Sequence, residues 1–357
     1  MNNFKFGLIS NIATIISGFA FKSEWFNTGE DKIIRIGNLK NNLISDLNVV
    51  RVNASKFEVP NIFKIKENDI LMALSGATTG KIAIAKKKDV GSYINQRVAI
   101  IRGKTIENSN YLRHIFNNQI LEKLISRAYG VAQPNLSPKN LSNLKIPIPS
   151  KIKQKYIASV LDTNVNILNK NNLVISNLNL LIQNIFIHMF GSTRSNPKKF
   201  PRKKLKEIIK FQGGSQPSAS FFSKTKTKDN IRLVQIRDFR TDKYKTYIPK
   251  KLAKRFFESD DVMIGRYGPP VFQIFRGLSG SYNVALMKAT PKENVTKDFI
   301  YYLLKEQDLH SFVVANSERT SGQSGVNLDL LENYEAFLPP KSLQIKFSRI
   351  ISIYNKT

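Results

Sequence analysis

The longest helix-compatible stretch of the chain lies near its middle, at residues 144–191. It opens with the extended segment IPIP, because each proline disfavours helix at the residue before it. From about Gln154 the chain contains no proline or glycine until Gly191, where the helix is expected to stop. The pattern predicts one helix of about 37 residues, on the order of 55 Å long.

Apolar residues recur at intervals of seven along this stretch, which predicts a helix with a coiled-coil seam. Asn164 and Asn171 interrupt the first half of the seam, so that half needs a partner helix. A long helix buried in one globular core is the alternative, but a helix of this length fits better between two domains. The seam residues are Leu161, Leu168, Ile175, Leu178, Ile182, Ile185 and Met189.

The hydrophobic patterns before and after the long helix repeat in the same order. Chance would not keep that order, so we predict an internal duplication. The matched segments are 12–18 with 208–214, 33–39 with 233–239, 68–76 with 260–268, 98–101 with 284–287, the helix beginning at Tyr111 with the helix beginning at Phe299, 132–137 with 323–329, and Gln154 with Gln344.

Each copy mixes strand and helix patterns. Leu112 and Phe116 share one face of a helix predicted over 111–125, which Ser109 or Asn110 would cap. We therefore expect an α+β fold, with two duplicated domains joined by the long coiled-coil-type helix and a second, truncated helix at the end. In the first copy, strands are predicted at 33–39 and 93–102, and residues 67–85 are predicted to form two strands joined by a glycine-containing turn.

These patterns place the domain boundaries at proline-rich and charged segments. The sequence STRSNPKKFPR, rich in proline and lysine, is typical of a linker. The expected parts are a first domain at 1–150, the helix at 151–191, the linker at 192–202, a second domain at 203–342 and the start of the second helix at 343–357.

Composition points to a polyanionic partner. Lysine and arginine number 56 against 26 acidic residues, which gives a net charge of +30. Nucleic acid is favoured over an anionic membrane or an acidic protein. Part of the surplus is the amino-acid bias expected of an AT-rich genome, because Asn, Lys and Ile are all abundant.

The chain has no cysteine and only three histidines, which argues against disulfides and metal sites and suits a reducing cytoplasm. The apolar segment at 4–21 lacks the basic start and the cleavage site of a signal peptide. No stretch is expected to reach the length of a membrane span. We expect a cytoplasmic protein.

The usual catalytic motifs are incomplete. No Asn/Asp-Pro-Pro-aromatic motif of an adenine methyltransferase is present, and no nucleophilic triad can be assembled. The stretch from Ser75 to Lys81 resembles a phosphate loop, but its spacing is one residue short and Ile82 replaces the metal-binding hydroxyl, so a turn between strands is favoured. We expect a non-catalytic chain without a cofactor of its own.

What remains is recognition, since basic residues lie in the predicted turns of both copies. Lysine and arginine neutralise phosphates, and arginine also reads base edges in the major groove. Each of these residues taken singly is better explained as a solvated surface charge, so the hypothesis rests on the set. The candidate DNA-binding residues are Lys81, Lys86, Lys87, Arg97, Arg232, Arg237, Arg240, Lys243 and Arg266.

The assembled pattern resembles the specificity subunits of type I restriction-modification systems. The resemblance is carried by IATIISG, NDILMALSGATTGKIAI and YINQRVAIIR in the first copy and by SDDVMIGRYG and LPPKSLQIKFSRI in the second. Its most specific part is the pattern IPIPxxxxQKxIAxxLD, which enters the long helix. The resemblance covers essentially the whole chain.

This resemblance implies two target recognition domains, each binding one half of a bipartite site in double-stranded DNA. Helices between them would fix the gap between the half-sites and dock two methyltransferase subunits, which carry S-adenosylmethionine. Restriction subunits with motor and nuclease activity would join the complex. The seven seam residues would then serve helix pairing and subunit docking.

Two departures from the family pattern matter. Family members normally have a second long helix that pairs with the first, whereas here only the start of that helix, residues 343–357, is present. We therefore expect the unpaired seam of the first helix to promote self-association. The loop beginning at Arg266 also differs from the loop beginning at Leu74, so the two copies should recognise different half-sites.

Three other interpretations stay open: a single-chain nucleic-acid enzyme, a duplicated RNA-binding protein and a coiled-coil scaffold. The enzyme lacks its motifs, and the strands lack the aromatic runs typical of RNA recognition. The scaffold leaves the charge unexplained. None of them requires sequence-specific DNA methylation.

Overall fold

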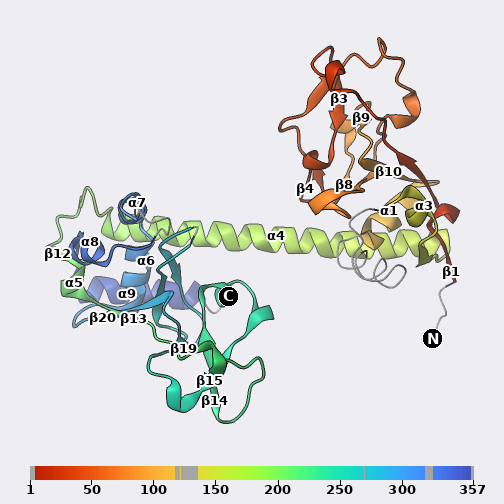
Figure 1. Ribbon diagram of the computed structural model, residues 1–357. Helices are drawn as coiled ribbons and strands as arrows, with labels where there is room; N and C mark the ends of the chain where they lie inside the picture. The colour runs from red at the N-terminus through yellow and green to blue at the C-terminus, as the bar shows by residue number, and fades with distance from the viewer. Residues whose placement is uncertain (1–4, 117–120, 122–135, 269, 318–324, 355–357) are drawn as a thin grey trace. The chain divides into compact units, whose positions relative to one another are not determined.

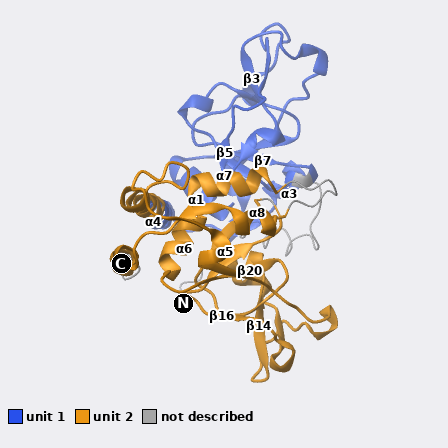
Figure 2. Cartoon of the chain, turned by 90° about the vertical axis from the view of Figure 1, so that its left-hand side faces the viewer, with its two compact units in different colours: residues 1–172 blue, residues 173–357 orange. Residues whose placement is uncertain are grey.

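The structure, a computed structural model, describes residues 5–116, 121, 136–268, 270–317 and 325–354. The chain forms two compact units, Met1–Asn172 and Leu173–Thr357 (Figure 2). The division falls inside the long helix α4, Lys151–Phe190, which therefore contributes residues to both units (Figure 1). The expected α+β fold with a long connecting helix is confirmed.

Unit 1 is built on a four-stranded antiparallel sheet in the order β2-β10-β7-β8. Every residue of β7 is buried, because both faces of the sheet are covered. Ile70 and Met72 face a core shared with the helices, whereas Leu71 and Ala73 face a second core with the smaller strands. The strands are β2 Ala13–Ser17, β10 Val98–Gly103, β7 Ile70–Ala73 and β8 Ile82–Ile84.

Smaller elements complete unit 1. A three-stranded sheet has the order β6-β3-β9, β4 pairs with β5, and β1 pairs with β11. The strands are β1 Phe6–Leu8, β3 Asp31–Ile34, β4 Leu39–Lys40, β5 Leu43–Ile44, β6 Val50–Val52, β9 Tyr93–Ile94 and β11 Lys145–Pro147. The helices are α1 Ile106–Ile115 and α3 Pro138–Ser142, with the 3-10 helices η1 Ile9–Asn11, η2 Ser23–Trp25, η3 Ile36–Asn38, η4 Asn61–Phe63, η5 Gly76–Thr78 and η6 Lys87–Asp89.

Two local predictions for unit 1 were wrong. Helix α1 begins at Ile106, because the Thr105 side chain accepts a hydrogen bond from the Asn108 amide and caps it. Ser109 therefore lies inside the helix, and the second half of the predicted 111–125 helix lies outside the described residues. The strand expected at 33–39 ends at Ile34 and continues as η3.

Unit 2 has the same construction. Its main sheet has the order β13-β20-β17-β18, and a second sheet has the order β15-β14-β19-β16. The strands are β12 Arg202–Lys204, β13 Ile209–Gly213, β14 Asn230–Val234, β15 Tyr247–Pro249, β16 Phe256–Phe257, β17 Val262–Gly265, β18 Gln273–Phe275, β19 Gly280–Tyr282, β20 Leu286–Pro291 and β21 Glu335–Phe337. The helices are α5 Leu205–Ile208, α6 Lys297–Leu304, α7 Gln307–Ala315, α8 Leu328–Asn333 and α9 Lys341–Tyr354, with η7 Ala219–Phe221, η8 Ile236–Phe239, η9 Asp242–Tyr244 and η10 Lys250–Leu252.

Strand pairing confirms the duplication and corrects one matched segment. Val98 pairs with Ala73 in unit 1, and Leu286 pairs with Gly265 in unit 2. Because Ala73 and Gly265 end equivalent strands, Val98 corresponds to Leu286. Residues 98–101 therefore match 286–289 rather than 284–287.

The duplication extends to a buried glutamine in each unit. Gln154 donates a hydrogen bond to the Pro149 carbonyl, and Gln344 donates one to the Pro339 carbonyl, both at 2.9 Å. Each amide oxygen accepts a hydrogen bond from the start of a helix segment, from Asn108 in unit 1 and from Thr296 in unit 2. The two glutamines thus tie the proline segment before α4 or α9 to its own unit.

Helix α4 changes its environment along its length. Leu161, Leu168 and Ile175 are 39%, 61% and 53% exposed. Ile182 is buried, and Ile185 and Met189 pack against the core of unit 2. The helix ends at Phe190, and Gly191 follows with φ +87°, as the sequence predicts.

By length and composition α4 is apolar enough to cross a membrane, so the expectation that no stretch reaches that length was wrong. Its exposed middle nevertheless carries amide side chains at Asn166, Asn169 and Asn172. In hydrocarbon each amide would need a hydrogen-bond partner. These asparagines argue against a position in hydrocarbon for the middle of α4.

Asp261 carries a testable part of the stability of unit 2. Its carboxylate is almost buried and accepts hydrogen bonds from the Glu258 amide and Lys288, and it pairs with Lys297 at 2.7 Å. Burial raises the pKa of this carboxyl, but the hydrogen bonds from Lys297, Glu258 and Lys288 outweigh burial and lower the pKa to about 2.

We expect Asp261→Asn to lower the free energy of unfolding at pH 7 by about 2 kcal/mol. A folded-state pKa below the unfolded value stabilises the protein above pH ~4, and this contribution is lost as pH falls toward ~2. Urea unfolding across that pH range should therefore show the variant converging on the wild type. The neighbouring Asp260→Asn, at an exposed position that also pairs with Lys297, should change little. A difference in the free energy of unfolding between Asp261→Asn and wild type that stays the same at every pH would contradict this account.

Candidate nucleic-acid interface

A tight hairpin and a loop form the candidate surface of unit 1. Strands β4 and β5 are joined by Asn41 and Asn42, whose φ values of 51° and 60° are those of a two-residue hairpin turn. The Asn38 side chain stabilises the hairpin, because it donates hydrogen bonds to the Ser45 and Leu47 carbonyls. These bonds fix the backbone that carries the exposed Lys40.

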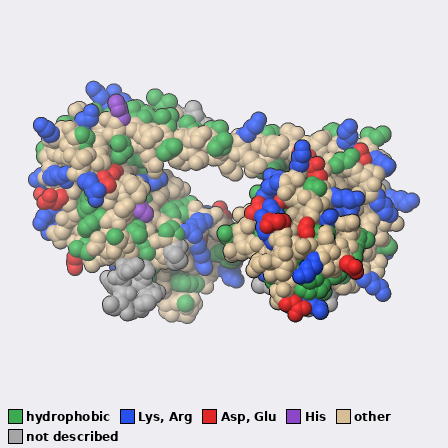
Figure 3. Space-filling model, turned by 90° about the horizontal axis from the view of Figure 1, so that it is seen from above, with side chains coloured by type: hydrophobic (Ala, Val, Ile, Leu, Met, Phe, Trp, Pro, Cys, Tyr) green, Lys and Arg blue, Asp and Glu red, His purple; other side chains and the backbone are tan. Residues whose placement is uncertain are grey.

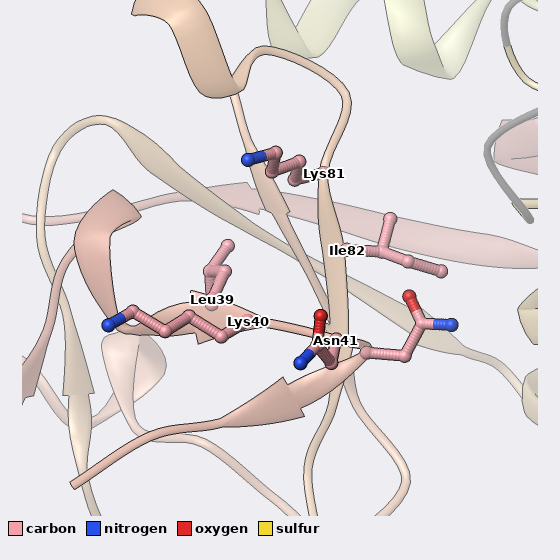
Figure 4. A pocket seen from close by; sticks show the side chains of 6 residues that line it. Leu39, Lys40, Asn41, Lys81 and Ile82 are labelled. Atoms are coloured by element: carbon pink, nitrogen blue, oxygen red, sulfur yellow. The ribbon is translucent and has the colours of Figure 1, made fainter. Parts of the chain in front are cut away.

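Lys40 and Lys81 line a hollow of about 250 Å³ together with Leu39, Asn41, Asn42 and Ile82 (Figure 4). Lys81 precedes β8, and its carbonyl accepts a hydrogen bond from the Ala73 amide. No acidic residue lines the hollow, and within the described ranges neither lysine makes an ion pair. Two unneutralised ammonium groups beside two amides suit an anionic ligand such as a phosphate.

A second hollow of about 360 Å³ continues this surface and shares Lys40. Arg35 lines it and donates a hydrogen bond to the Asn48 carbonyl at 3.0 Å. Arg97 lies near the same loop, because its carbonyl accepts a hydrogen bond from the Leu74 amide. The structure therefore brings Lys40 and Lys81 together, places Arg35 in the adjoining hollow, and puts the Arg97 backbone beside Leu74 at the start of the loop after β7.

The other candidates of unit 1 lie elsewhere. Lys86 and Lys87 follow β8, at the opposite end of that strand from Lys81. Lys88 beside them pairs with Asp46 at 2.8 Å, and hydrogen bonds from Lys32 and Lys88 lower the pKa of Asp46 to about 2. The structure does not bring these lysines to the hollow.

The phosphate-like loop is a turn between strands, as the sequence favours. Residues Gly76–Thr78 form η5 between β7 and β8. Gly76 and Gly80 both have positive φ, near 80°, which side-chain-bearing residues rarely adopt. The loop thus places Lys81 at the hairpin and leads into β8, whereas a phosphate loop would lead into the N-terminus of an α-helix.

The equivalent surface of unit 2 lies at η8, η9 and β18. Arg237 and Lys243 both lie over the ring of Tyr244, 5.5 and 5.4 Å from its centroid. Arg240, just after η8, donates a hydrogen bond to the Gln273 side-chain oxygen. These cations are exposed and make no ion pair among the residues that the structure describes.

Arg232 and Arg266 are less available. The Arg232 guanidinium lies 3.1 Å from Asp242 and 3.7 Å from Asp238, so its charge is already balanced within unit 2. Arg266 lies over the Tyr267 ring at 5.2 Å and reaches the Val284 carbonyl. Tyr267 in turn pairs with Gly325, which fixes this loop.

Cationic side chains are also spread over the rest of the surface, and blue exceeds red on the face shown in Figure 3. Charge alone therefore does not mark the site. Arg35, Lys40 and Gln273 are not among the candidates predicted from the sequence, although the Asn41-Asn42 pair is a hairpin signal that places Lys40 beside a turn.

Comparisons with known proteins agree on one family. Residues 1–177 and 197–357 match the family described as type I restriction modification DNA specificity domain. The chain is 23% identical over 279 residues to the type I restriction enzyme MjaVIII specificity subunit of Methanocaldococcus jannaschii, covering 68% of this chain and 62% of that protein. It is 27% identical over 167 residues to the EcoAI specificity subunit of Escherichia coli, covering 45% of this chain and 28% of that protein. Both matches cover less than two thirds of the relative.

Solved structures share the fold. The type I restriction-modification S subunit from M. genitalium superposes with a TM-score of 0.57 at 15% identity, covering 100% of this chain and 91% of that one. A chain from a structural study of complex assembly in the type I system gives a TM-score of 0.54 at 14% identity, with the same coverage.

Proposed function

The chain belongs to the type I restriction modification DNA specificity domain family, and from this membership we propose that it is the sequence-recognition subunit of a type I restriction-modification complex. Each unit would bind one half of a bipartite site in double-stranded DNA. The observation that carries the proposal is that two copies of one fold present different side chains at the same place. Lys40 and Lys81 occupy it in unit 1, and Arg240 and Gln273 occupy it in unit 2.

The chain itself would be non-catalytic. Adenine methylation would come from two methyltransferase subunits carrying S-adenosylmethionine, and restriction from motor-nuclease subunits, all in the cytoplasm. The exposed apolar side chains of α4, among them Leu161, Leu168 and Ile175, support docking of such subunits, because apolar surface of this extent is favourable to bury. The same side chains would let the chain associate with a second copy.

A genome-wide map of N6-methyladenine tests the proposal. In cells carrying the partner methyltransferase, we expect a split motif of two short blocks around a fixed gap, which disappears when this chain is deleted. Exchange of residues 1–150 for another such domain should alter one block and leave the other unchanged. A methylation pattern that is identical with and without the chain would show that it does not specify the site.

A further inference from the structure

Arg240 and Gln273 occupy the positions that Lys40 and Lys81 hold in unit 1. The helices η3 and η8 follow equivalent strands. In η3 the Asn38 side chain accepts a hydrogen bond from a backbone amide at the helix start, and in η8 Asp238 does the same. Lys40 and Arg240 each come two residues after this side chain. Lys81 lies opposite Ala73, and Gln273 lies opposite Gly265, at the ends of equivalent strands. The fold therefore presents one pair of side chains in each unit at the same place.

In unit 2 this pair is fixed by a short hydrogen-bond chain. The Gln273 Nε2 group donates to the Pro270 carbonyl at 2.8 Å, which sets the direction of its side-chain oxygen. That oxygen accepts a hydrogen bond from Nη2 of Arg240. The guanidinium is thereby held in one orientation at the surface, although nothing neutralises its charge within the described residues.

The backbone beneath Arg240 is also fixed. Phe239 stacks on Phe275 with ring centroids 4.4 Å apart and planes 10° from parallel. A side chain at Gly265 would meet Ile236 at 3.3 Å, so η8 lies directly against β17. Pre-organisation of this kind reduces the conformational entropy that a flexible arginine loses on binding.

An oriented guanidinium has one preferred partner among DNA bases. One hydrogen of Nη2 goes to Gln273, which leaves a second Nη2 hydrogen and the Nη1 hydrogens as a fork. Such a fork matches the O6 and N7 acceptors of guanine in the major groove. We infer that Arg240 contacts a guanine in the half-site of unit 2 and that Gln273 is its positioning residue. This inference rests on the proposed function.

Among the described residues, neither Lys40 nor Lys81 makes a side-chain hydrogen bond of this kind, and the two lysines line a hollow. Lysine acts as a point charge and lacks the planar fork. The equivalent pair in unit 1 therefore suits a phosphate, and a base at this place would be discriminated less. The pair exchange Arg240→Lys with Gln273→Lys puts the unit 1 chemistry into unit 2.

In the test, the full chain is assembled with its methyltransferase, and the DNA sequences that this complex binds are selected from a random library. We expect the motif selected by the wild type to contain a guanine that Arg240 contacts. Arg240→Gln should reduce the preference for guanine over the other bases at that position by ~10- to 100-fold and leave the preferences at the other positions unchanged. Gln273→Leu and the pair exchange should weaken discrimination at the same position. Arg237→Gln, an exposed arginine on η8 beside Tyr244, is the matched control and should weaken binding to all sequences alike, with the salt slope reduced by about 1. Thermal unfolding of each variant shows that its fold is intact.

The outcomes separate two failures. A wild-type complex that selects no motif would overturn the proposed function itself. A clear wild-type motif that Arg240→Gln leaves intact, or uniform weakening like that of Arg237→Gln, would overturn the assignment of Arg240 while the proposed function stands.

Discussion

Substitution of alanine for Phe186 is expected to lower the free energy of unfolding of unit 2 by about 3–5 kcal/mol. Phe186 is 2% exposed and lies on the part of α4 that belongs to unit 2. Its ring contacts Phe190, Phe299 and Phe347 at centroid distances of 4.9, 5.8 and 5.5 Å. Removing it leaves a cavity where α4 and α9 meet, and the surrounding rings cannot collapse without losing their own contacts.

The chain offers a probe and a control for this prediction. Its single tryptophan, Trp25, lies in unit 1, so its fluorescence reports on that unit. Circular dichroism reports on both units. We expect Phe186→Ala to destabilise unit 2. The circular dichroism transition of unit 2 should therefore shift, whereas the Trp25 fluorescence transition of unit 1 should stay in place. Ile187→Ala, at a 42% exposed neighbour on the same helix, should shift neither. An equal shift of both signals would mean that the two units unfold together.

The sequence predicted the duplication because the order of hydrophobic segments survives in both copies. It missed the register at β20 for a physical reason. Side chains of a strand alternate with a period of two, so a shift by two residues keeps every apolar side chain on the same face. Only the pairing of Val98 with Ala73 and of Leu286 with Gly265 distinguishes the alternatives.

Local hydrogen bonds explain the other differences. Several residues before α1 are able to cap a helix, and Thr105 does so because its side chain reaches the Asn108 amide. The Asn38 side chain accepts a hydrogen bond from the Arg35 amide at 3.0 Å, which turns the chain out of β3 into η3. Such contacts compete with strand propensity and leave little trace in a hydrophobic pattern.

The candidate DNA-binding residues divide according to their partners, which the sequence does not display. By sequence Arg232 and Arg240 are both basic candidates, but in the structure Asp238 and Asp242 form ion pairs with Arg232. Lys81 and Lys40 are 41 positions apart in the chain and meet only because the hairpin lies against the start of β8. Charge in turns is therefore a useful first filter, and the ion pairs decide which cations stay available.

The long helix gives the second prediction with a large expected effect. Leu168 and Ile175 are more than half exposed on α4, at two successive positions of the heptad pattern. If subunits or a second copy dock there, each side chain contributes ~1.5–3 kcal/mol of association free energy when buried. The double variant Leu168→Gln, Ile175→Gln should then weaken association by ~100- to 10,000-fold.

Gel filtration of the chain alone, and co-purification with the methyltransferase, measure this effect. Glutamine keeps the helix propensity high, and both side chains are exposed in the isolated chain, so the unfolding transitions should stay in place. Lys170→Gln, a polar substitution between the two sites, is the matched control and should leave assembly intact. Among the residues that the structure describes, Leu168 and Ile175 belong to no core cluster of unit 1 or unit 2. Assembly that survives the double substitution would therefore require a docking surface other than the exposed face of α4.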